Sequence, residues 1–397
     1  MHNTFSWRDS KVVDTFKPVI FTVCRFITGL QLKIKSFFSQ RTKTILLVGT
    51  SEITVDFLLE MDEILKDFGD KQTFMLVSKR SQKFAQTKLL NYPKKITLIS
   101  LIPALCLPWG LIVFADHNNV VWFHPDIPKI YYSHGLEAGK SYGRGGNYAY
   151  GQNSLSKGGD LVYDLMFVDN SYNRDIFLRD NPALEGKLAV IGNLMADKLV
   201  ELNQKREVIR RDLSIQEDDQ ILVVFSTWGP HSLIQRFGKV VLDELPKITH
   251  RYKIYIFVHP LNDGAAFVDR SIIFELLEDY KRRGIAERVD PKKRSLPYLV
   301  AADIVLTDHS SLSLYYALLG RPFLFVPFVD GCLMKEALNW KFYELQEKYN
   351  PNLPLSDQLD WAIKNFPAEE HEKLARLVVD ERGQARQRIR DEIAKFL

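Results

Sequence analysis

The stretch that decides the fold runs from residue 301 to residue 325 and reads AADIVLTDHSSLSLYYALLGRPFLF. Its residues 303–307 form a short apolar run, typical of a strand buried in a parallel sheet. Four polar residues, 308–311, follow at once, and apolar residues then recur at helical spacing. Residues 322–326 (PFLFV) predict the next strand. Strand, helix and strand in this order indicate parallel strands joined by a crossover helix.

The same alternation extends through most of the chain. Before a strongly polar stretch at 201–219, apolar runs that predict strands occur at 43–49, 73–77, 96–101, 110–114, 129–132, 160–169 and 188–192. After it they occur at 221–225, 253–258, 303–307 and 322–326. We therefore predict an α/β protein with two Rossmann-like, doubly wound domains that face each other across a cleft. Residues 43–200 form the first, 201–219 the linker and 220–397 the second.

The positive charge of the chain is concentrated at its N-terminus. The whole chain has a net charge of +4, but residues 1–43 alone hold eight Lys or Arg and two Asp or Glu. Apolar residues recur at helical spacing from 12 to 38, with basic residues between them. Residues 1–42 therefore predict a basic amphipathic helix that lies on an anionic membrane surface. A helix that packs on its own domain would have the same periodicity, and this alternative stays open.

Composition excludes several classes of protein. The 397 residues are 46% hydrophobic and 26% charged, which is typical of a globular protein rather than a disordered one. The small net charge gives no reason to expect nucleic acid as a partner. No stretch reads as a secretory signal or as a convincing transmembrane helix. Cys24, Cys106 and Cys332 are few and far apart in sequence, which favours neither a zinc site nor an oxidising compartment. We expect a cytoplasmic protein.

Ligands of open α/β sheets bind beyond the carboxyl ends of the strands, so the residues that follow each strand are the candidates. His134 follows the strand predicted at 129–132 and is placed to act as a general base. Residues 139–159 come next, with seven glycines and three tyrosines. This loop has few apolar anchors, so we expect it to close over a substrate. A structural histidine beneath a loose loop is the alternative.

The second half offers three such positions. Ser226 and Thr227 follow one strand, and His259 follows the next. The polar residues 308–311 precede a helix, whose unpaired N–H groups and partial positive charge would bind an anion such as phosphate. A plain helix cap uses the same residue types and is the alternative.

Several common catalytic motifs are absent from the sequence. There is no G-x-x-x-x-G-K-[ST] motif, no G-x-G-x-x-G motif after the first strand and no H-E-x-x-H motif. No group of histidines and carboxylates suggests a metal site. We expect catalysis by side chains and helix dipoles with no obligatory cofactor, although Mg²⁺ could accompany a donor diphosphate.

Taken in order, these segments resemble the CDP-glycerol glycerophosphotransferase family, whose members build teichoic acids and capsule polymers and have the GT-B fold. The resemblance covers roughly residues 130–397. It rests on His134-Gly135, residues 160–169, Ile191-Gly192-Asn193 with Asp197, Ser226-Thr227-Trp228, His259-Pro260, residues 302–325 and residues 380–389. The chain departs from the family pattern at His309, where a tyrosine is usual, at Tyr315, and at Leu194-Met195. These departures concern the choice of donor more than the fold.

The resemblance implies transfer of an alditol phosphate, from glycerol or ribitol, from a CDP-linked donor to a hydroxyl of a lipid-linked or polymeric glycan, with release of CMP. It places the enzyme on the inner face of a bacterial cell membrane. His134 would remove the proton of the acceptor hydroxyl, and His259 would stabilise charge on the donor diphosphate. The expected donor-binding residues are Ser226, Thr227, Asp308, His309, Ser310 and Ser311. Gly135, Tyr142 and Arg144 would lie on the acceptor side.

Three other functions are compatible with this sequence. A GT-B glycosyltransferase that uses a nucleotide sugar for capsule or lipopolysaccharide synthesis would have the same fold and the same kind of base. A UDP-sugar 2-epimerase also has two such domains, but it would need no lipid acceptor. A catalytically silent scaffold in a polymer-export complex would not depend on His134 at all.

Overall fold

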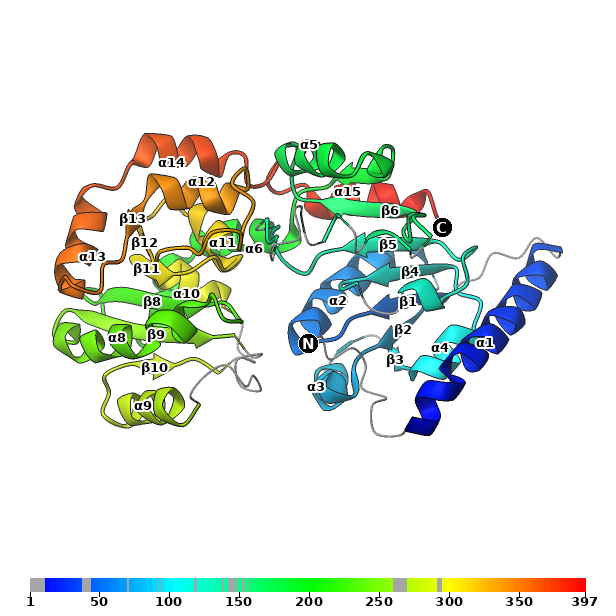
Figure 1. Cartoon of the computed structure of the whole chain (residues 1–397), viewed down its shortest axis with the longest axis horizontal. Coiled ribbons are helices and arrows are strands. Elements are labelled where there is room, and N and C mark those ends of the chain that lie inside the picture. The colour runs from blue at the N-terminus through cyan, green and yellow to red at the C-terminus, as the bar shows by residue number, and fades with distance from the viewer. Residues whose placement is uncertain are drawn as a thin grey trace.

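The computed structural model of the chain consists of two lobes, each built on one parallel sheet with helices on both faces (Figure 1). The structure describes residues 11–37, 44–69, 71–90, 92–93, 95–117, 120–137, 139–141, 147, 149–151, 154–156, 158–259, 270–290 and 295–397. The predicted pair of doubly wound domains is confirmed.

The first lobe holds a seven-stranded sheet in the order β3-β2-β1-β4-β5-β6-β7. Its strands are β1 (Thr44–Val48), β2 (Gln72–Leu76), β3 (Thr97–Leu98), β4 (Leu111–Phe114), β5 (Lys129–Tyr132), β6 (Leu165–Val168) and β7 (Leu188–Val190). The helices that precede or join them are α1 (Lys11–Phe37), α2 (Glu52–Leu65), α3 (Lys79–Leu90), α4 (Leu101–Cys106) and α5 (Ser171–Asp180). Short 3₁₀ helices include η2 (Val120–Trp122).

The second lobe holds a six-stranded sheet in the order β10-β9-β8-β11-β12-β13. Its strands are β8 (Gln220–Ser226), β9 (Tyr252–Val258), β10 (Glu287–Arg288), β11 (Ile304–Thr307), β12 (Phe323–Phe325) and β13 (Glu347–Lys348). The remaining helices are α6 (Leu194–Asn203), α7 (Arg206–Asp212), α8 (Leu233–Ile248), α9 (Arg270–Arg282), α10 (Leu296–Ala301), α11 (Leu312–Ala317), α12 (Leu338–Leu345), α13 (Leu355–Lys364), α14 (Ala368–Ala375) and α15 (Ala385–Ala394).

The unbroken apolar strands follow from burial on both faces of each sheet. In β1, Ile45 and Leu47 belong to one core cluster, and Leu46 and Val48 belong to the cluster on the opposite face. All four side chains are fully buried, because successive residues of a strand point to opposite faces and helices cover both. The apolar runs in the sequence therefore predict the central strands well.

The last helix corrects the predicted domain boundary. Ile389 and Ile393 of α15 are fully buried in the core cluster of the first sheet, beside residues of α2. Figure 1 shows the red C-terminal helix on the first lobe, after the chain has crossed back from the second. Residues 220–397 therefore do not form one lobe, because the amphipathic terminal helix completes the core of the other.

The predicted linker at 201–219 is mostly helical and packs on the second lobe. Arg210 of α7 is buried, and its guanidinium donates to the carbonyl oxygens of Ala301 and Asp219 at 3.0 and 2.6 Å. Ala196 and Leu199 of α6 belong to the second lobe's core. The polar composition of the segment reflects these buried hydrogen bonds and the exposed helix faces rather than an extended linker.

The N-terminal helix α1 lies along the outer side of the first lobe, away from the second lobe (Figure 1). It packs beside α4, with Cys24 and Thr28 buried. Over the turns whose side chains the structure describes, the opposite face carries exposed apolar residues: Val19, Val23, Phe26, Ile27 and Leu30. No helix in the described part of the chain is both long and apolar enough to cross a membrane.

Candidate active site

The two lobes meet at the carboxyl ends of their strands. Residues 139–141 of the first lobe pair with residues 332–334 of the second through the amide of Met334, which donates to the carbonyl oxygen of Gly139 at 2.9 Å. A Cβ on Gly135 would lie 3.7 Å from the Oγ of Ser311. The segments that follow β5 and β11 are therefore neighbours, and the candidate residues of the two lobes share one site.

His134 follows β5 and has a side chain that is 40% exposed. Its Nδ1 lies 3.2 Å from the carbonyl oxygen of Ala115 and 3.5 Å from Oδ1 of Asp116. Both partners are acceptors, so this network assigns the proton of the neutral ring to Nδ1 and leaves the lone pair on Nε2. That tautomer is the one a general base requires.

Asp116 is held in place by Thr50, the residue two positions after β1. The backbone amide and the hydroxyl of Thr50 donate to Oδ2 of Asp116 at 2.9 and 2.7 Å. This arrangement leaves Oδ1 facing His134, so Thr50 orients Asp116 and Asp116 in turn orients the imidazole. Asp116 is not among the residues predicted from the sequence, although it comes two residues after β4, where ligands of such sheets bind.

Lys140 is a second residue that sequence reasoning missed. Its Nζ donates to Oγ1 of Thr227 across the two lobes at 3.3 Å. Burial lowers the pKa of Lys140, and the charges of Asp308 and Glu137 oppose that shift. No ion pair joins Lys140 to a carboxylate among the described residues. A positive charge placed between the lobes in this way suits an anionic ligand. Its only sign in the sequence is its position beside the first glycine of the loop.

His259 and His309 are neutral in the protein as it stands. Burial lowers the pKa of His259 to about 3, and the charges of Lys140 and His134 act in the same direction. Burial likewise lowers the pKa of His309 to about 3. A neutral imidazole can donate or accept a hydrogen bond, but it carries no charge with which to stabilise a diphosphate. The expected role of His259 in stabilising charge on a diphosphate is therefore limited to hydrogen bonding.

Asp308 and Ser226 link the loops that follow β8 and β11 through hydrogen bonds. Asp308 is fully buried and accepts hydrogen bonds from the backbone amides of Thr227, Leu233 and Ser310 at 2.7 to 3.1 Å. Burial raises its pKa to about 6, which these hydrogen bonds oppose. The hydroxyl of Ser226 donates to the Asp308 carboxylate at 3.2 Å. Both side chains already form hydrogen bonds within the protein, so they position the loops rather than contact a donor.

The helix after β11 is shorter than the sequence suggests. Helix α11 has six residues, and Ser311 at its start makes no side-chain cap. The amide of Ser310 donates to Asp308, and its hydroxyl accepts from the amide of Leu312 at 3.3 Å. Groups of the protein thus accept hydrogen bonds from two amides at the start of the helix. Fewer amides remain for a ligand, so the anion site that we expected from the helix dipole is weaker than predicted.

The glycine-rich loop is partly anchored, contrary to our expectation. Tyr150 is buried, its ring stacks on Phe177 at 4.0 Å, and its hydroxyl donates to the carbonyl oxygen of Phe167 at 2.6 Å. Tyr150 thus supplies an apolar anchor that the glycine count conceals. Tyr142 and Arg144, which we placed on the acceptor side, lie outside the described residues.

A polar network joins the two lobes through Tyr315, Asn193 and Asp169. The hydroxyl of Tyr315 donates to Oδ1 of Asn193 at 3.2 Å, and Nδ2 of Asn193 donates to Asp169 at 2.9 Å. The amide of Glu137 also donates to Asp169, at 3.0 Å. Burial raises the pKa of Asp169 to about 7, and burial together with the charge of Asp169 raises that of Glu137 to about 8. Tyr315, which departs from the family pattern, therefore connects the two lobes.

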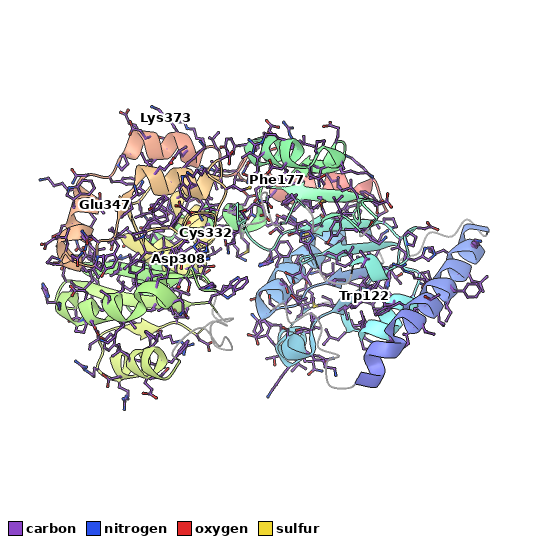
Figure 2. The ribbon with its side chains drawn as sticks, in the orientation of Figure 1. Trp122, Phe177, Asp308, Cys332, Glu347 and Lys373 are labelled. Carbon is purple, nitrogen blue, oxygen red and sulfur yellow. The ribbon has the colours of Figure 1, made fainter. Side chains whose placement is uncertain are left out.

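A cavity of about 280 Å³ lies in the second lobe beside Thr227. It is lined by Trp228, Gly229, Pro230, His231, His309, Asp330, Gly331 and Cys332. Figure 2 shows Asp308 and Cys332 in this part of the second lobe, on the side toward the first. The volume is close to the lower end of the range for ligand pockets, ~300 Å³. Within the described ranges, no three His, Cys, Asp or Glu side chains form a group that could hold a metal ion.

Residues 140–328 match the family model described as CDP-glycerol:poly(glycerophosphate) glycerophosphotransferase. The match covers nearly half of the chain, which over these residues is similar to that family. The match contains Lys140, Thr227, His259 and Asp308, and thus both sides of the contact between the lobes. The match indicates a transferase of the glycerophosphotransferase type.

Solved structures with the same arrangement of lobes are distant in sequence. A variant of the wall teichoic acid polymerase TagF is 15% identical and has a TM-score of 0.64, over 94% of this chain and 97% of that one. The UDP-GlcNAc 2-epimerase of Neisseria meningitidis, bound to UDP-GlcNAc, is 14% identical with a TM-score of 0.55, over 89% and 100%. Alr3699/HepE of Anabaena, in complex with UDP and glucose, is 13% identical with a TM-score of 0.51, over 89% and 99%.

These likenesses confirm the GT-B type of fold that we predicted. The fold alone does not distinguish a transferase from an epimerase, because both classes have it. The match to the family model is what favours a transferase. No curated protein sequence matched the chain.

Proposed function

We propose that this glycerophosphotransferase transfers an alditol phosphate, from glycerol or ribitol, from a CDP-linked donor to a hydroxyl of a lipid-linked or polymeric glycan, with release of CMP. The observation that carries the proposal is the contact between Lys140 and Thr227, with His134 on the same side of the site. One lobe thereby contributes a base and a cation, and the other contributes hydroxyl groups and a cavity beside them.

In the proposed reaction, Nε2 of His134 takes the proton of the acceptor hydroxyl. The acceptor oxygen attacks the β-phosphorus of the donor, and the bond from that phosphorus to the bridging oxygen breaks. CMP leaves with the bridging oxygen, and the alditol phosphate stays on the acceptor. Asp116 stabilises the imidazolium that forms, since its Oδ1 faces the protonated Nδ1. Phosphoryl transfer depends mainly on positioning and on stabilisation of charge.

We place the donor between Lys140 and the cavity beside Thr227. Lys140 would supply positive charge to the diphosphate, and neutral His259 and His309 would supply hydrogen bonds. A structure of a TagF variant was determined after a soak with CDPG, which supports a CDP-linked donor for this chain. Any Mg²⁺ would arrive with the diphosphate, to which hard cations bind through oxygen.

We further propose that the enzyme is cytoplasmic and peripheral on the inner face of the cell membrane. The exposed apolar face of α1 (Val19, Val23, Phe26, Ile27 and Leu30) supports this location, since apolar side chains on one face of a helix insert among lipids. The basic residues of the N-terminal region would add attraction to an anionic surface. A lipid-linked acceptor would then be presented beside the first lobe.

The full-length protein tests the proposal when it is offered CDP-glycerol, CDP-ribitol, UDP-glucose and UDP-GlcNAc separately, each with a lipid-linked glycan acceptor. We expect CMP from a CDP-alditol and no UDP. Release of UDP with transfer of a sugar would instead establish a glycosyltransferase, and conversion of UDP-GlcNAc without an acceptor would establish an epimerase.

Variants of His134 test the mechanism. We expect His134→Ala to lower kcat by a factor of roughly 10² to 10⁴, the range for loss of a general base. Asp116→Asn should lower kcat less, because the carbonyl oxygen of Ala115 still holds Nδ1. The matched control is His250→Ala, since His250 is exposed. If His134→Ala kept full activity with an unchanged melting temperature, His134 would have no part in the mechanism.

A further inference from the structure

Helix α1 is fastened to the first lobe along one face. The ring of Phe21 stacks on that of Trp122 at 4.4 Å, and the hydroxyl of Thr28 donates to the carbonyl oxygen of Leu105 in α4 at 2.8 Å. A Cβ on Gly29 would lie 2.8 Å from Nε2 of His124, so the helix approaches the body closely there. Trp122 lies next to α1 in Figure 2.

Two cysteines meet in the middle of this contact. Cys24 of α1 and Cys106 at the end of α4 are 82 positions apart in sequence, and the thiol of Cys106 donates to Sγ of Cys24 at 2.7 Å. Cys24 is only 4% exposed, whereas Cys106 is half-buried. Both are free thiols in this structure. A disulfide has a sulfur–sulfur length of about 2.05 Å, so a small approach of the two side chains would join them.

We propose that Cys24 and Cys106 are a site of reversible oxidative modification, at which a disulfide fastens α1 covalently to α4. The juxtaposition is specific, because the residues on either side of the pair already fix the register of α1 on the lobe. Cys332, the third cysteine, lies between the lobes beside Lys140 and Asp330 and takes no part.

The oxidant we name is a low-molecular-weight disulfide. The thiolate of Cys106 attacks one sulfur of that disulfide and expels one small thiolate. The sulfur of Cys24 then attacks Sγ of Cys106, which forms the protein disulfide and expels the second small thiolate. Two protein thiols lose two electrons and two protons, and the oxidant becomes two thiols.

The order of these steps follows from exposure. An oxidant reaches the half-buried Cys106 before it reaches Cys24. Burial, and then the hydrogen bond with Cys106, raise the pKa of the Cys24 thiol to about 12, so Cys24 is the poorer first nucleophile. In a reducing compartment the pair would remain as two thiols, and the bond would form when the thiol pool is oxidised.

The consequence concerns the exposed apolar face of α1. Cys24 lies on the side of α1 that faces the lobe, and Phe26, Ile27 and Leu30 lie on the side that faces outward. A bond at Cys24 therefore leaves the outward face free. It also prevents α1 from leaving α4, because the two helices can no longer separate without breaking the bond.

A thiol count on the full-length protein tests this inference directly. The protein is treated with glutathione disulfide, unfolded in denaturant and labelled with a maleimide. We expect the count to fall from the three cysteines of the chain to one, with a mass loss of two hydrogen atoms and a cross-linked peptide that joins the segments around Cys24 and Cys106. Dithiothreitol should restore three thiols.

Two variants serve as controls. Cys106→Ser should keep both of its remaining thiols after oxidation, and Cys332→Ser should fall from two thiols to none. Three labelled thiols in oxidised wild-type protein would overturn the inference. A glutathione adduct on Cys106 without the cross-link would overturn it as well, and so would a bond between two molecules. The thiol count on wild-type protein does not depend on the variants, so the inference can still be tested if a serine variant is unstable.

Discussion

At the scale of single residues, the surrounding protein sets the orientation of some site groups and the protonation state of others. Asp116 and Ala115 fix the ring of His134, whereas burial leaves His259 and His309 neutral. Lys140 spans the contact between the lobes, where an anionic ligand would favour its protonated form. Sequence position identified His134 and His259, but the neutral state of His259 follows from burial.

We predict that Lys140→Met lowers kcat/KM for the CDP-linked donor by roughly 10²-fold or more, the effect expected when a preorganised group that stabilises phosphate charge is removed. Lys140→Arg should retain more activity, because it keeps the charge. The surface variant Lys239→Met, which removes only an exposed ion pair with Asp243, is the control. Steady-state kinetics with varied donor checks this, and equal kcat/KM in Lys140→Met and wild type would contradict it.

Glu137 gives a pH-dependent prediction for stability. Its folded pKa of about 8 exceeds its ordinary value of 4.5, so the folded state binds the proton more tightly than the unfolded state does. The resulting stability is fully present below pH 4.5 and is lost as the pH rises through 8. Relative to wild type, Glu137→Gln should therefore gain melting temperature between pH 5 and 9. A constant difference between the two proteins across that range would refute the assignment.

At the scale of elements, α1 combines two faces with different partners. Phe21, Cys24 and Thr28 face the lobe, and Val23, Phe26 and Leu30 face outward. Helical spacing in the sequence suggests one apolar stripe, whereas the structure divides the apolar residues between the two sides. The structure therefore confirms the alternative of a helix that packs on its own domain, and membrane association stays a prediction that concerns the outward face.

We predict that Phe26→Glu weakens binding to vesicles that contain phosphatidylglycerol by roughly 10-fold or more, since insertion of one phenylalanine contributes about 1.5–3 kcal/mol. Phe26 is 74% exposed, so the fold should be unaffected. Leu90→Glu is the matched control, because Leu90 is 83% exposed on α3. Cosedimentation measures both variants. An equal loss in both would show that α1 is not the binding surface.

At the scale of the whole molecule, the chain crosses between the lobes twice, first into α6 and α7 and then back to α15. The return is fixed by Asp380, whose carboxylate accepts from the amide of Ser171 at 3.0 Å, and by Asn170, whose side chain donates to the carbonyl oxygen of Val378 at 2.7 Å. The C-terminal helix thus ties the second lobe to the first. Loss of the packing of α15 on the first lobe should therefore lower the free energy of unfolding of the protein.

We predict that Ile389→Ala lowers the free energy of unfolding by about 2–5 kcal/mol, the range for truncating a fully buried isoleucine. Gln387→Ala, on the exposed face of the same helix, should change it by no more than about 0.5 kcal/mol. Urea denaturation measures both. A similar small effect in the two variants would mean that α15 is not part of the first lobe's core.

The sequence did not predict the two-residue edge strands β10 and β13. It did predict the longer strands, the division into two sheets and the strand-end positions of His134 and His259. These follow from local patterns, because burial on both faces makes a strand apolar and ligands bind where parallel strands end. It could not place α15, Lys140 or the Cys24–Cys106 pair. Such contacts join residues far apart in the chain, and only the packing of whole helices and lobes brings them within bonding distance.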